Sequence, residues 1–335
     1  MTTAAPLPGP SPKPLPADAS EALRARWRSA LRLSPRLAPY VFISPFLILF
    51  AVFGLFPLMF SLWLAFQSWE PTSGLEAMTF VGLDNFAFAL QDEWFWKSLR
   101  NTGWLAVASG VPQHLVAIPL AVFIHTSFKR LRNAAVGAYF LPYITSTVAI
   151  AIMFSSLFST DYGLINVGLK AMSQVPVLGW FMPADPIDWM GRPENIKPAV
   201  AMIVFWRYVG FNVVLYLAAL QTIPKDLYEA ATMDGAGRLQ QFAFITLPSL
   251  KPMIFFGVTL SVIGGLQLFE EPFILTGGRG GSDQAGMTTA IYLYRMAFDF
   301  NDFGAASAMS WLLFVVVAVL TWATNRAFHP RGGSK

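Results

Sequence analysis

The chain has 335 residues, of which 55% are apolar and only 13% are charged. Soluble domains usually contain about 25% charged residues, and the apolar residues here form long uncharged runs, which excludes a soluble enzyme and indicates a polytopic membrane protein. There is no Cys, and His114, His125 and His329 are far apart, so we expect no disulfide, no metal site and no cofactor. The net charge of +4 indicates membrane orientation rather than nucleic-acid binding.

The N-terminal region is predicted to contain a tail and one short helix. Proline at every second position from Pro6 to Pro16 predicts that residues 1–17 are a disordered Pro-rich tail. Residues 18–38 begin with a capping-box-like Asp18 and Glu21 and then place apolar and basic residues on different faces (Leu23, Trp27, Ala30, Leu31; Arg24, Arg28, Arg32). We interpret this as a cytoplasmic interfacial helix, with a solvated charged helix as the alternative.

Six apolar stretches follow, each close to the roughly 20 residues that cross a bilayer. They define an all-α transmembrane permease domain at 39–328, with a cytoplasmic tail at 329–335. The predicted spans are 40–66, 102–124, 134–158, 199–220, 253–269 and 305–323.

The charges of the connecting segments predict the orientation of these spans. The tail, the loops after spans 2 and 4, and the C-terminus together hold 15 Lys and Arg, whereas the other three loops hold 7. Because cytoplasmic loops are enriched in basic residues, both termini are predicted to be cytoplasmic.

Few polar side chains fall inside the spans. Arg207 lies within span 4, where an unpaired charge is costly, so we expect it to face the bundle interior, a partner or water; it either lines a cavity or bonds the carbonyls of a neighbouring helix. No Asp or Glu falls inside a predicted span, and Glu270 and Glu271 are placed at the outer end of span 5. This weakens the hypothesis of an ion-coupled carrier. We interpret His114 as a packed, hydrogen-bonded residue.

The cytoplasmic loop at 221–252 carries the most informative pattern. Pro224 is expected to open a helix, Gly235 and Gly237 to end it with positive φ, and a second short helix to run from Arg238 to about Thr246 until Pro248 and Pro252 stop it. The small face at Ala230 and Ala231, beside Glu229, is suited to a partner's groove.

This loop resembles the EAA signature of permease subunits of binding-protein-dependent ABC importers. The resemblance is carried by Glu229-Ala230-Ala231, Asp234-Gly235-Ala236, Phe242, Ile245, Pro248 and Pro252, and the chain from about Tyr40 onward is similar to the maltose-type carbohydrate permeases. Weaker family-like strings are 80–86 (FVGLDNF), Leu141-Pro142, 163–166 (GLIN), 275–278 (LTGG) and 303–308 (FGAASA). After 276–278 the family commonly continues with Pro, whereas this chain has Arg279-Gly280-Gly281-Ser282, which leaves the shape of the 276–287 outer loop open.

The resemblance implies a transport subunit with the six-helix permease fold of type I ABC importers in a bacterial cell membrane, with no catalytic residues. It implies a second permease subunit as a heterodimer partner, two ATPase subunits and an extracytoplasmic sugar-binding protein. The residues that would contact the ATPase are those of the EAA loop: Glu229, Ala230, Ala231, Asp234, Gly235, Leu247 and Pro248. No glycine run has the Lys-Ser/Thr of a phosphate-binding loop, so ATP hydrolysis is assigned to the partners.

The sequence does not identify the sugar. Sugar sites combine aromatic faces with groups that bond hydroxyls, and the substrate-pathway candidates on spans 4 and 5 are Arg207, Tyr208, Asn212, Tyr216, Ser261, Gly264, Gly265 and Gln267. Two other functions are considered. A membrane-embedded transferase acting on lipid-linked sugars needs clustered acidic or His residues near the bilayer, and none is obvious. A secondary carrier needs buried carboxylates and does not account for the EAA loop.

Overall fold

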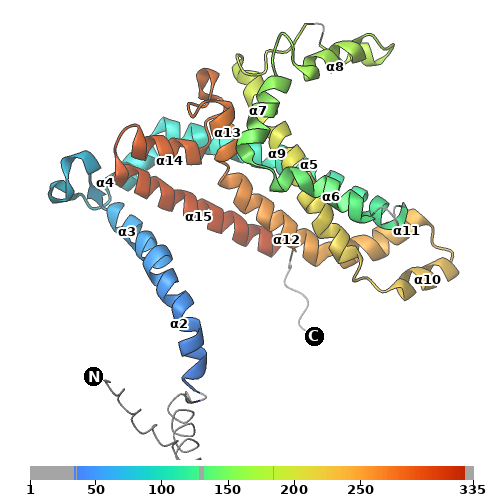
Figure 1. Cartoon of the computed structure of the whole chain (residues 1–335), viewed down its shortest axis with the longest axis horizontal. Coiled ribbons are helices and arrows are strands. Elements are labelled where there is room, and N and C mark those ends of the chain that lie inside the picture. The colour runs from blue at the N-terminus through green and yellow to red at the C-terminus, as the bar shows by residue number, and fades with distance from the viewer. Residues whose placement is uncertain (1–33, 35, 128–131, 184, 329–335) are drawn as a thin grey trace, which may run out of the picture. The chain divides into compact units, whose positions relative to one another are not determined.

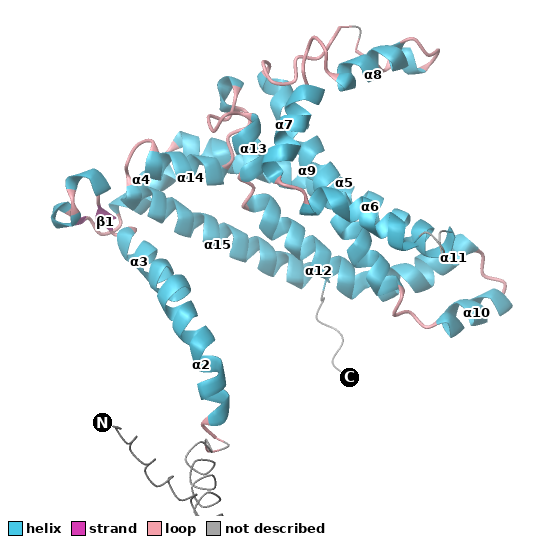
Figure 2. Cartoon of the chain, viewed as in Figure 1, coloured by secondary structure: helices cyan, strands magenta, loops and turns pink. Residues whose placement is uncertain are grey.

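The computed structural model describes residues 34, 36–127, 132–183 and 185–328. Almost all regular structure in these residues is helical, with one pair of two-residue strands, β1 (Gln67–Ser68) and β2 (Thr79–Phe80), as Figures 1 and 2 show. The chain divides into two units, Met1–Ser61 and Leu62–Lys335. The predicted tail at 1–17, most of the predicted interfacial helix at 18–38 and the tail at 329–335 lie outside the described residues.

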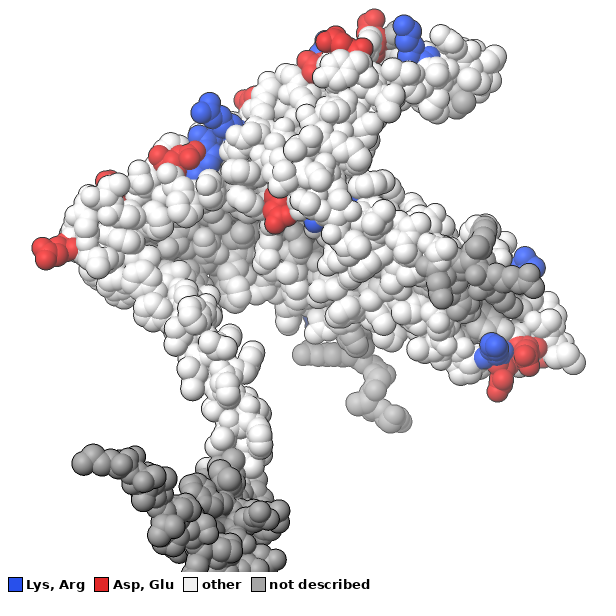
Figure 3. Space-filling view, in the orientation of Figure 1, with Lys and Arg blue, Asp and Glu red and all other residues white. Residues whose placement is uncertain are grey.

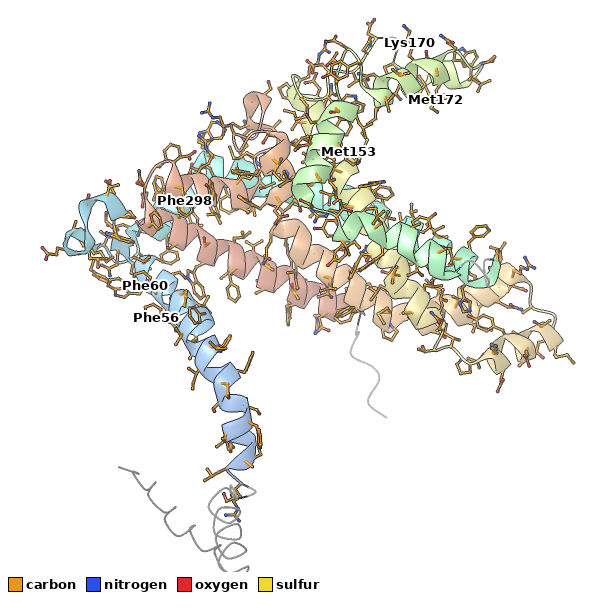
Figure 4. The ribbon with its side chains drawn as sticks, viewed as in Figure 1. Phe56, Phe60, Met153, Lys170, Met172 and Phe298 are labelled. Carbon is orange, nitrogen blue, oxygen red and sulfur yellow. The ribbon has the colours of Figure 1, made fainter. Side chains whose placement is uncertain are left out.

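The first span is apolar on every side. α2 (Ala38–Phe50) continues through a π-helical turn (Ala51–Leu55) into α3 (Phe56–Leu64), and none of the residues of α2 is buried. The π turn comes directly before Pro57, which has no N–H to donate to the carbonyl four residues earlier, and the Phe56 amide bonds instead to Ala51. Phe56 and Phe60 stack with ring centroids 6.0 Å apart (Figure 4).

The second unit contains the other helices. In chain order they are α4 (Asp84–Gln91), α5 (Glu93–Ser127), α6 (Arg132–Ile144), α7 (Thr147–Leu157), α8 (Leu164–Ser173), α9 (Pro193–Leu220), α10 (Lys225–Met233), α11 (Arg238–Gln241), α12 (Leu247–Leu266), α13 (Glu270–Leu275), α14 (Thr289–Phe298) and α15 (Phe303–Phe328). α9 packs against α5, α6 and α12, and α15 packs against α4, α12 and α14.

Close helix contacts depend on small residues, as expected where lipid supplies no hydrophobic force between helices. A Cβ added at Gly210 on α9 would lie 1.7 Å from the carbonyl oxygen of Tyr139 on α6. A Cβ at Gly304, in the FGAASA string, would lie 2.1 Å from the carbonyl oxygen of Gln67. Asn85, in the FVGLDNF string, donates to that same carbonyl at 2.8 Å, so these two strings meet at Gln67.

Two predicted spans are broken rather than continuous. Together, α6 and α7 are long and apolar enough to form one span, but the chain bends by 92° between them at Thr145–Ser146, where Ser146 has ψ 129. Span 5 was predicted over 253–269, yet α12 begins at Leu247 and ends at Leu266, and a non-helical Gln267–Phe269 segment separates it from α13. Apolar composition identifies such spans but carries no signal for a break set by tertiary contacts.

The described residues contain five helices long and apolar enough to cross a membrane, or six if the bent pair forms one span. On the visible face, charged side chains gather near the α4, α14 and α8 end and near α10, with one acidic patch beside α13 between them (Figure 3). The prediction of an all-α polytopic membrane fold is confirmed.

Candidate functional site

The loop at 221–252 folds into a helical elbow, which we define as residues 224–247. α10 starts after Pro224, as predicted, and ends in a Schellman motif: the Ala236 amide donates to the Ala231 carbonyl at 2.8 Å and the Gly235 amide to the Thr232 carbonyl at 3.0 Å. Gly235 has φ +79, a left-handed value that a side chain would strain. Gly237 has φ −71, so only one of the two glycines predicted to have positive φ needs it.

The second arm of the elbow corrects the prediction that Pro248 and Pro252 stop a short helix. α11 passes through a π-helical turn (Phe242–Thr246) directly into α12, and the whole is one apolar helix segment. Pro248 lies in the first turn of α12, just after the π turn, and Pro252 lies inside α12. A proline removes one donor, and a π turn or a small bend accommodates that loss without ending the helix.

Side-chain hydrogen bonds join the two arms of the elbow. Gln241 Nε2 donates to Thr232 Oγ1 at 3.0 Å and to the Ala236 carbonyl at 3.1 Å. The Tyr228 hydroxyl bonds the Thr246 hydroxyl at 2.9 Å. Sequence analysis did not identify these residues, because their partners lie across the turn. The bonds fix the angle between α10 and α12, so the elbow is suited to act as a rigid unit.

The elbow presents both charged and apolar side chains to the outside. Of the EAA residues, Glu229, Ala230, Asp234, Gly235, Leu247 and Pro248 are exposed and Ala231 is half-buried. Three large apolar side chains beside them are among the most exposed of the chain: Met233 at 89%, Leu239 at 84% and Phe244 at 78%. Sequence analysis did not single out these three residues. Exposed apolar side chains of this kind are a candidate interaction surface.

A cavity of about 230 Å³ lies between α5, α6, α9 and α12. Its wall is formed by Ser109, Gly110, Gln113, Tyr143, Val204, Tyr208, Phe211, Asn212, Leu260, Ser261, Gly264, Gly265 and Leu268. Five of the eight substrate-pathway candidates are therefore in one wall: Tyr208, Asn212, Ser261, Gly264 and Gly265. No Lys, Arg, Asp or Glu lines this cavity.

The wall combines aromatic rings with amides and hydroxyls. The rings of Tyr143 and Phe211 stack at 4.8 Å, and Tyr143 meets Tyr208 edge-on at 5.8 Å. The buried Asn212 Nδ2 donates to Gln113 Oε1 at 3.2 Å, which fixes both amides. Gln113 and Tyr143 lie on α5 and α6, where no sugar-contact candidate was named. Phe211 lies on the same face of α9 as Tyr208 and Asn212 but was not predicted. Such a wall can stack a sugar ring and bond its hydroxyls.

Arg207 lies outside the cavity wall and pairs with a buried carboxylate. Its Nη1 is 2.7 Å from Glu271 Oε1 and 4.0 Å from Glu270 Oε2; the Arg207 side chain is 11% exposed and that of Glu271 is 3% exposed. Thr147, at the start of α7, donates to Glu270 Oε2 at 2.5 Å. This geometry is consistent with the expectation that Arg207 is sheltered. The observed partner is a carboxylate, whereas the sequence analysis expected Arg207 either to line a cavity or to bond helix carbonyls.

The other two candidates also lie outside the cavity wall. Tyr216 is fully buried, and its hydroxyl bonds His114 Nδ1 at 2.7 Å, while His114 Nε2 bonds Ser261 Oγ at 3.0 Å. His114 is thus packed and hydrogen-bonded, as interpreted from the sequence. Gln267 is exposed in the break after α12. Within the described residues, no group of three His, Asp or Glu could hold a metal ion.

Two of the weaker strings, GLIN and LTGG, lie at structural turns. In the GLIN string, Asn166 bonds the backbone of Ile187 in both directions, at 2.9 and 3.1 Å. The 276–287 segment is a turn in which Gly277, Gly278, Gly280 and Gly281 all have positive φ. The Asn101 amide donates to the Met287 carbonyl at 3.1 Å and holds this turn to α5.

Known proteins resemble the chain over nearly its whole length. Residues 117–331 match the family described as binding-protein-dependent transport system inner membrane component. The arabinooligosaccharides transport system permease protein AraP of Bacillus subtilis (strain 168) is 33% identical over 308 residues, covering 90% of this chain and 91% of AraP. The lactose transport system permease protein LacF of Rhizobium radiobacter is 34% identical, covering 91% of this chain and 98% of LacF.

Solved structures share the fold. One is a chain of a bacterial ABC transporter involved in the import of the acidic polysaccharide alginate, with a TM-score of 0.72 and 25% identity, covering 93% of this chain and 98% of that chain. The other is a chain of the alginate ABC transporter in complex with an alginate pentasaccharide-bound periplasmic protein, with a TM-score of 0.70 and 25% identity, covering 91% and 95%. 

Proposed function

The chain belongs to the family of binding-protein-dependent transport system inner membrane components, and from this premise we propose that it forms half of the translocation pathway of an ATP-driven sugar or oligosaccharide importer. It is a transport permease rather than an enzyme. Its relatives AraP and LacF are named for arabinooligosaccharides and lactose, which supports a sugar as the transported molecule.

The observation that carries the coupling proposal is the continuity of one helix. The elbow and the cavity wall share the helical segment that runs from Arg238 through the π turn to Leu266. Leu260, Ser261, Gly264 and Gly265 line the cavity on the same segment. Movement of the elbow, driven by closure of ATPase subunits, would therefore be transmitted along α12 to the cavity wall and rock spans 3 to 5 between inward-open and outward-open states.

The partners follow from this proposal. Two cytoplasmic ATPase subunits bind the elbow through Glu229, Ala230, Ala231, Asp234 and Gly235, with Leu247 and Pro248 at the base of the second arm. A second permease subunit completes the pathway as a heterodimer, and an extracytoplasmic sugar-binding protein delivers the sugar. The chain resides in the bacterial cell membrane with both termini cytoplasmic.

The cavity wall supplies the sugar contacts on this side of the pathway. Tyr208, Asn212, Ser261, Gly264 and Gly265 are the residues proposed to face the sugar. Arg207 instead connects α9 to α13, Tyr216 fixes His114, and Gln267 lies in the break of span 5.

The buried Glu271 bears on the argument against a secondary carrier. The sequence places Glu270 and Glu271 at the outer end of span 5 and no carboxylate inside a span; in the structure Glu271 is 3% exposed and lies just after the break between α12 and α13. It is paired with Arg207 and so is not a free ion ligand. The proposal of an ATP-driven importer therefore rests on the family to which the chain belongs.

Uptake measurements test the proposal. Cells that lack this chain should lose uptake of a sugar in a panel of radiolabelled mono- and oligosaccharides, and the restored gene should recover it. Uptake that persists without ATP, or that does not need the binding protein, would contradict an ATP-driven importer.

A further inference from the structure

In Figure 1, α8 lies beyond the end of α7, outside the bundle of α5, α9, α12 and α15. α8 follows span 3 and the elbow follows span 4, so the order of the spans places them on opposite sides of the membrane. One face of α8 packs inward, where Ile165 and Leu169 join the cluster around Phe158 and Trp189. The amide of Asn166 bonds Ile187 and accepts from Trp189 Nε1 at 3.2 Å. These contacts fix the rotation of α8 about its axis, so the directions of its other side chains are determined.

The outward faces of this segment are strongly apolar. Leu164 is 68% exposed, Val175 45% and Met172 43%. In the loop that follows α8, Val177, Trp180 and Phe181 are 65%, 87% and 77% exposed. In water, so many contiguous exposed apolar side chains mark an interaction surface.

Lys170 and Met172 lie on opposite flanks of α8. Lys170 and Met172 are two residues apart, which on an α-helix places them on nearly opposite faces. In Figure 4, Lys170 points away from the bundle and Met172 points towards the space beneath α8, where Met153 of α7 also lies. Leu164, eight residues before Met172, lies about 80° from it around the helix axis. Val175 follows α8, which ends at Ser173. α8 therefore has a basic flank at Lys170 and an apolar flank at Met172, and the exposed Leu164 and Val167 lie between them.

We propose that α8 and the loop to Phe181 form an interfacial anchor that rests on the lipid headgroup region at the membrane surface opposite the elbow. Three observations favour lipid as the occupant. The preceding helix α7, part of span 3, also exposes apolar side chains, Val148 at 53% and Ile152 at 61%. Lys170 is directed away from this apolar side, as in helices that lie in an interface. Trp180, Phe181 and Tyr162 are aromatic, the side chains enriched at that depth.

The anchor has a mechanical consequence. α7 leads from the 92° bend to the turn at residues 158–163, which precedes α8, and Thr147 at its start bonds Glu270 of α13. Fixing α8 at the lipid surface holds the outer end of α7 at constant depth. When the other spans rock, the angle between α6 and α7 would then change, and α7 would not move through the bilayer.

The absence of Cys makes a direct test simple. Met172→Cys and, as the matched control, Lys170→Cys would each carry a nitroxide spin label in the assembled importer in phospholipid nanodiscs, with the unsubstituted complex as the labelling blank. Collision with oxygen, which concentrates in lipid, is compared with collision with a water-soluble nickel chelate. We expect the oxygen-to-nickel ratio to be several-fold higher at Met172 than at Lys170. Leu164→Cys, which lies nearer to Met172 than to Lys170 around the helix axis, replaces it if that variant does not assemble.

Three outcomes would overturn the proposal. Strong nickel collision at both positions would place the segment in water. Exclusion of both reagents at Met172 would indicate a protein occupant, the second permease. A label at Met172 that becomes protected only after addition of the sugar-binding protein would make this surface its docking site. None of these outcomes concerns transport, so failure of the anchor and failure of the import function are distinguishable.

Discussion

Arg207 of α9 and Glu271 of α13 form an ion pair of 2.7 Å, which joins span 4 to the short helix that follows the break in span 5. Both side chains are almost fully buried, and their helices belong to different spans. Such a pair is costly to break from one side, because the remaining charge stays buried without a partner. It therefore holds α13 against α9 near Tyr208, at the edge of the cavity wall.

The first prediction concerns this pair. Arg207→Leu leaves Glu271 unpaired and should destabilise the assembled complex by about 3 to 5 kcal/mol, as breaking a buried ion pair from one side does. Combining it with Glu271→Leu removes both charges and should recover much of that loss. Thermal unfolding of the purified complex and sugar uptake measure the effect. The matched control is Arg295→Leu, which breaks the more exposed Arg295–Asp299 pair.

Equal stability of wild type and Arg207→Leu would contradict this prediction. So would a double variant that loses as much stability as the sum of the two single ones, since it would show that the two charges do not interact.

The second prediction concerns the elbow. Gly235 has φ +79, and a β-branched side chain is strained there, so Gly235→Val should disrupt the Schellman turn and uncouple ATP hydrolysis from transport or release the ATPase. Gly237→Ala is the matched control, because Gly237 has φ −71 and an added Cβ would meet only Gln240 Oε1 at 3.8 Å. Co-purification of the ATPase and its stimulated hydrolysis in liposomes are measured. Wild-type values for Gly235→Val in both assays would reject the coupling role.

Local features of the fold were predictable from the sequence, and long-range ones were not. Pro224 and Gly235 mark the two ends of α10 because capping and left-handed backbone depend on the residue itself. The Arg207–Glu271 pair joins residues 64 positions apart, and Glu271 lies just beyond a span whose break no local pattern indicates. Pro248 was misread as a stop because its lost hydrogen bond is accommodated by a π turn, which depends on the preceding backbone.

The cavity wall also shows that the sequence does not predict which way a side chain faces. Tyr208, Asn212 and Ser261 were predicted from residue type on the correct spans and line the wall. Tyr216 is equally suitable by type but faces His114. Periodicity identifies a helix, whereas the direction of each face depends on how neighbouring helices rotate and pack.

The third prediction concerns orientation. The division of basic residues, 15 against 7, predicts that both termini are cytoplasmic. A reporter enzyme that is active only outside the cytoplasm should be silent when fused after Lys335 and active when fused near Asp185, in the loop after α8. The opposite pattern would reverse the proposed sides of the elbow and the α8 anchor. A cytoplasm-active reporter at both positions supplies the matched control for expression.

The fourth prediction tests the charge on the elbow. Glu229 is exposed on α10, beside Ala230 and near the strongly exposed Met233. A basic group of the ATPase that meets this carboxylate would form a charge-assisted hydrogen bond, worth about 1.5 to 3 kcal/mol when partly buried. Glu229→Lys replaces attraction by repulsion, so ATPase co-purification and binding-protein-stimulated hydrolysis should fall while membrane insertion is unchanged.

Two further variants separate this contact from the general charge of the elbow. Glu229→Gln keeps the shape of the side chain and should weaken ATPase binding less than Glu229→Lys does. Asp226→Lys makes the same change of charge in the first turn of α10, outside the EAA residues, and should leave co-purification near the wild-type level. If Asp226→Lys and Glu229→Lys release the ATPase equally, the elbow attracts its partner through overall charge, and a specific contact at Glu229 is refuted. If neither variant changes binding or hydrolysis, Glu229 has no part in coupling, and the exposed apolar side chains of Met233, Leu239 and Phe244 would have to supply the contact alone.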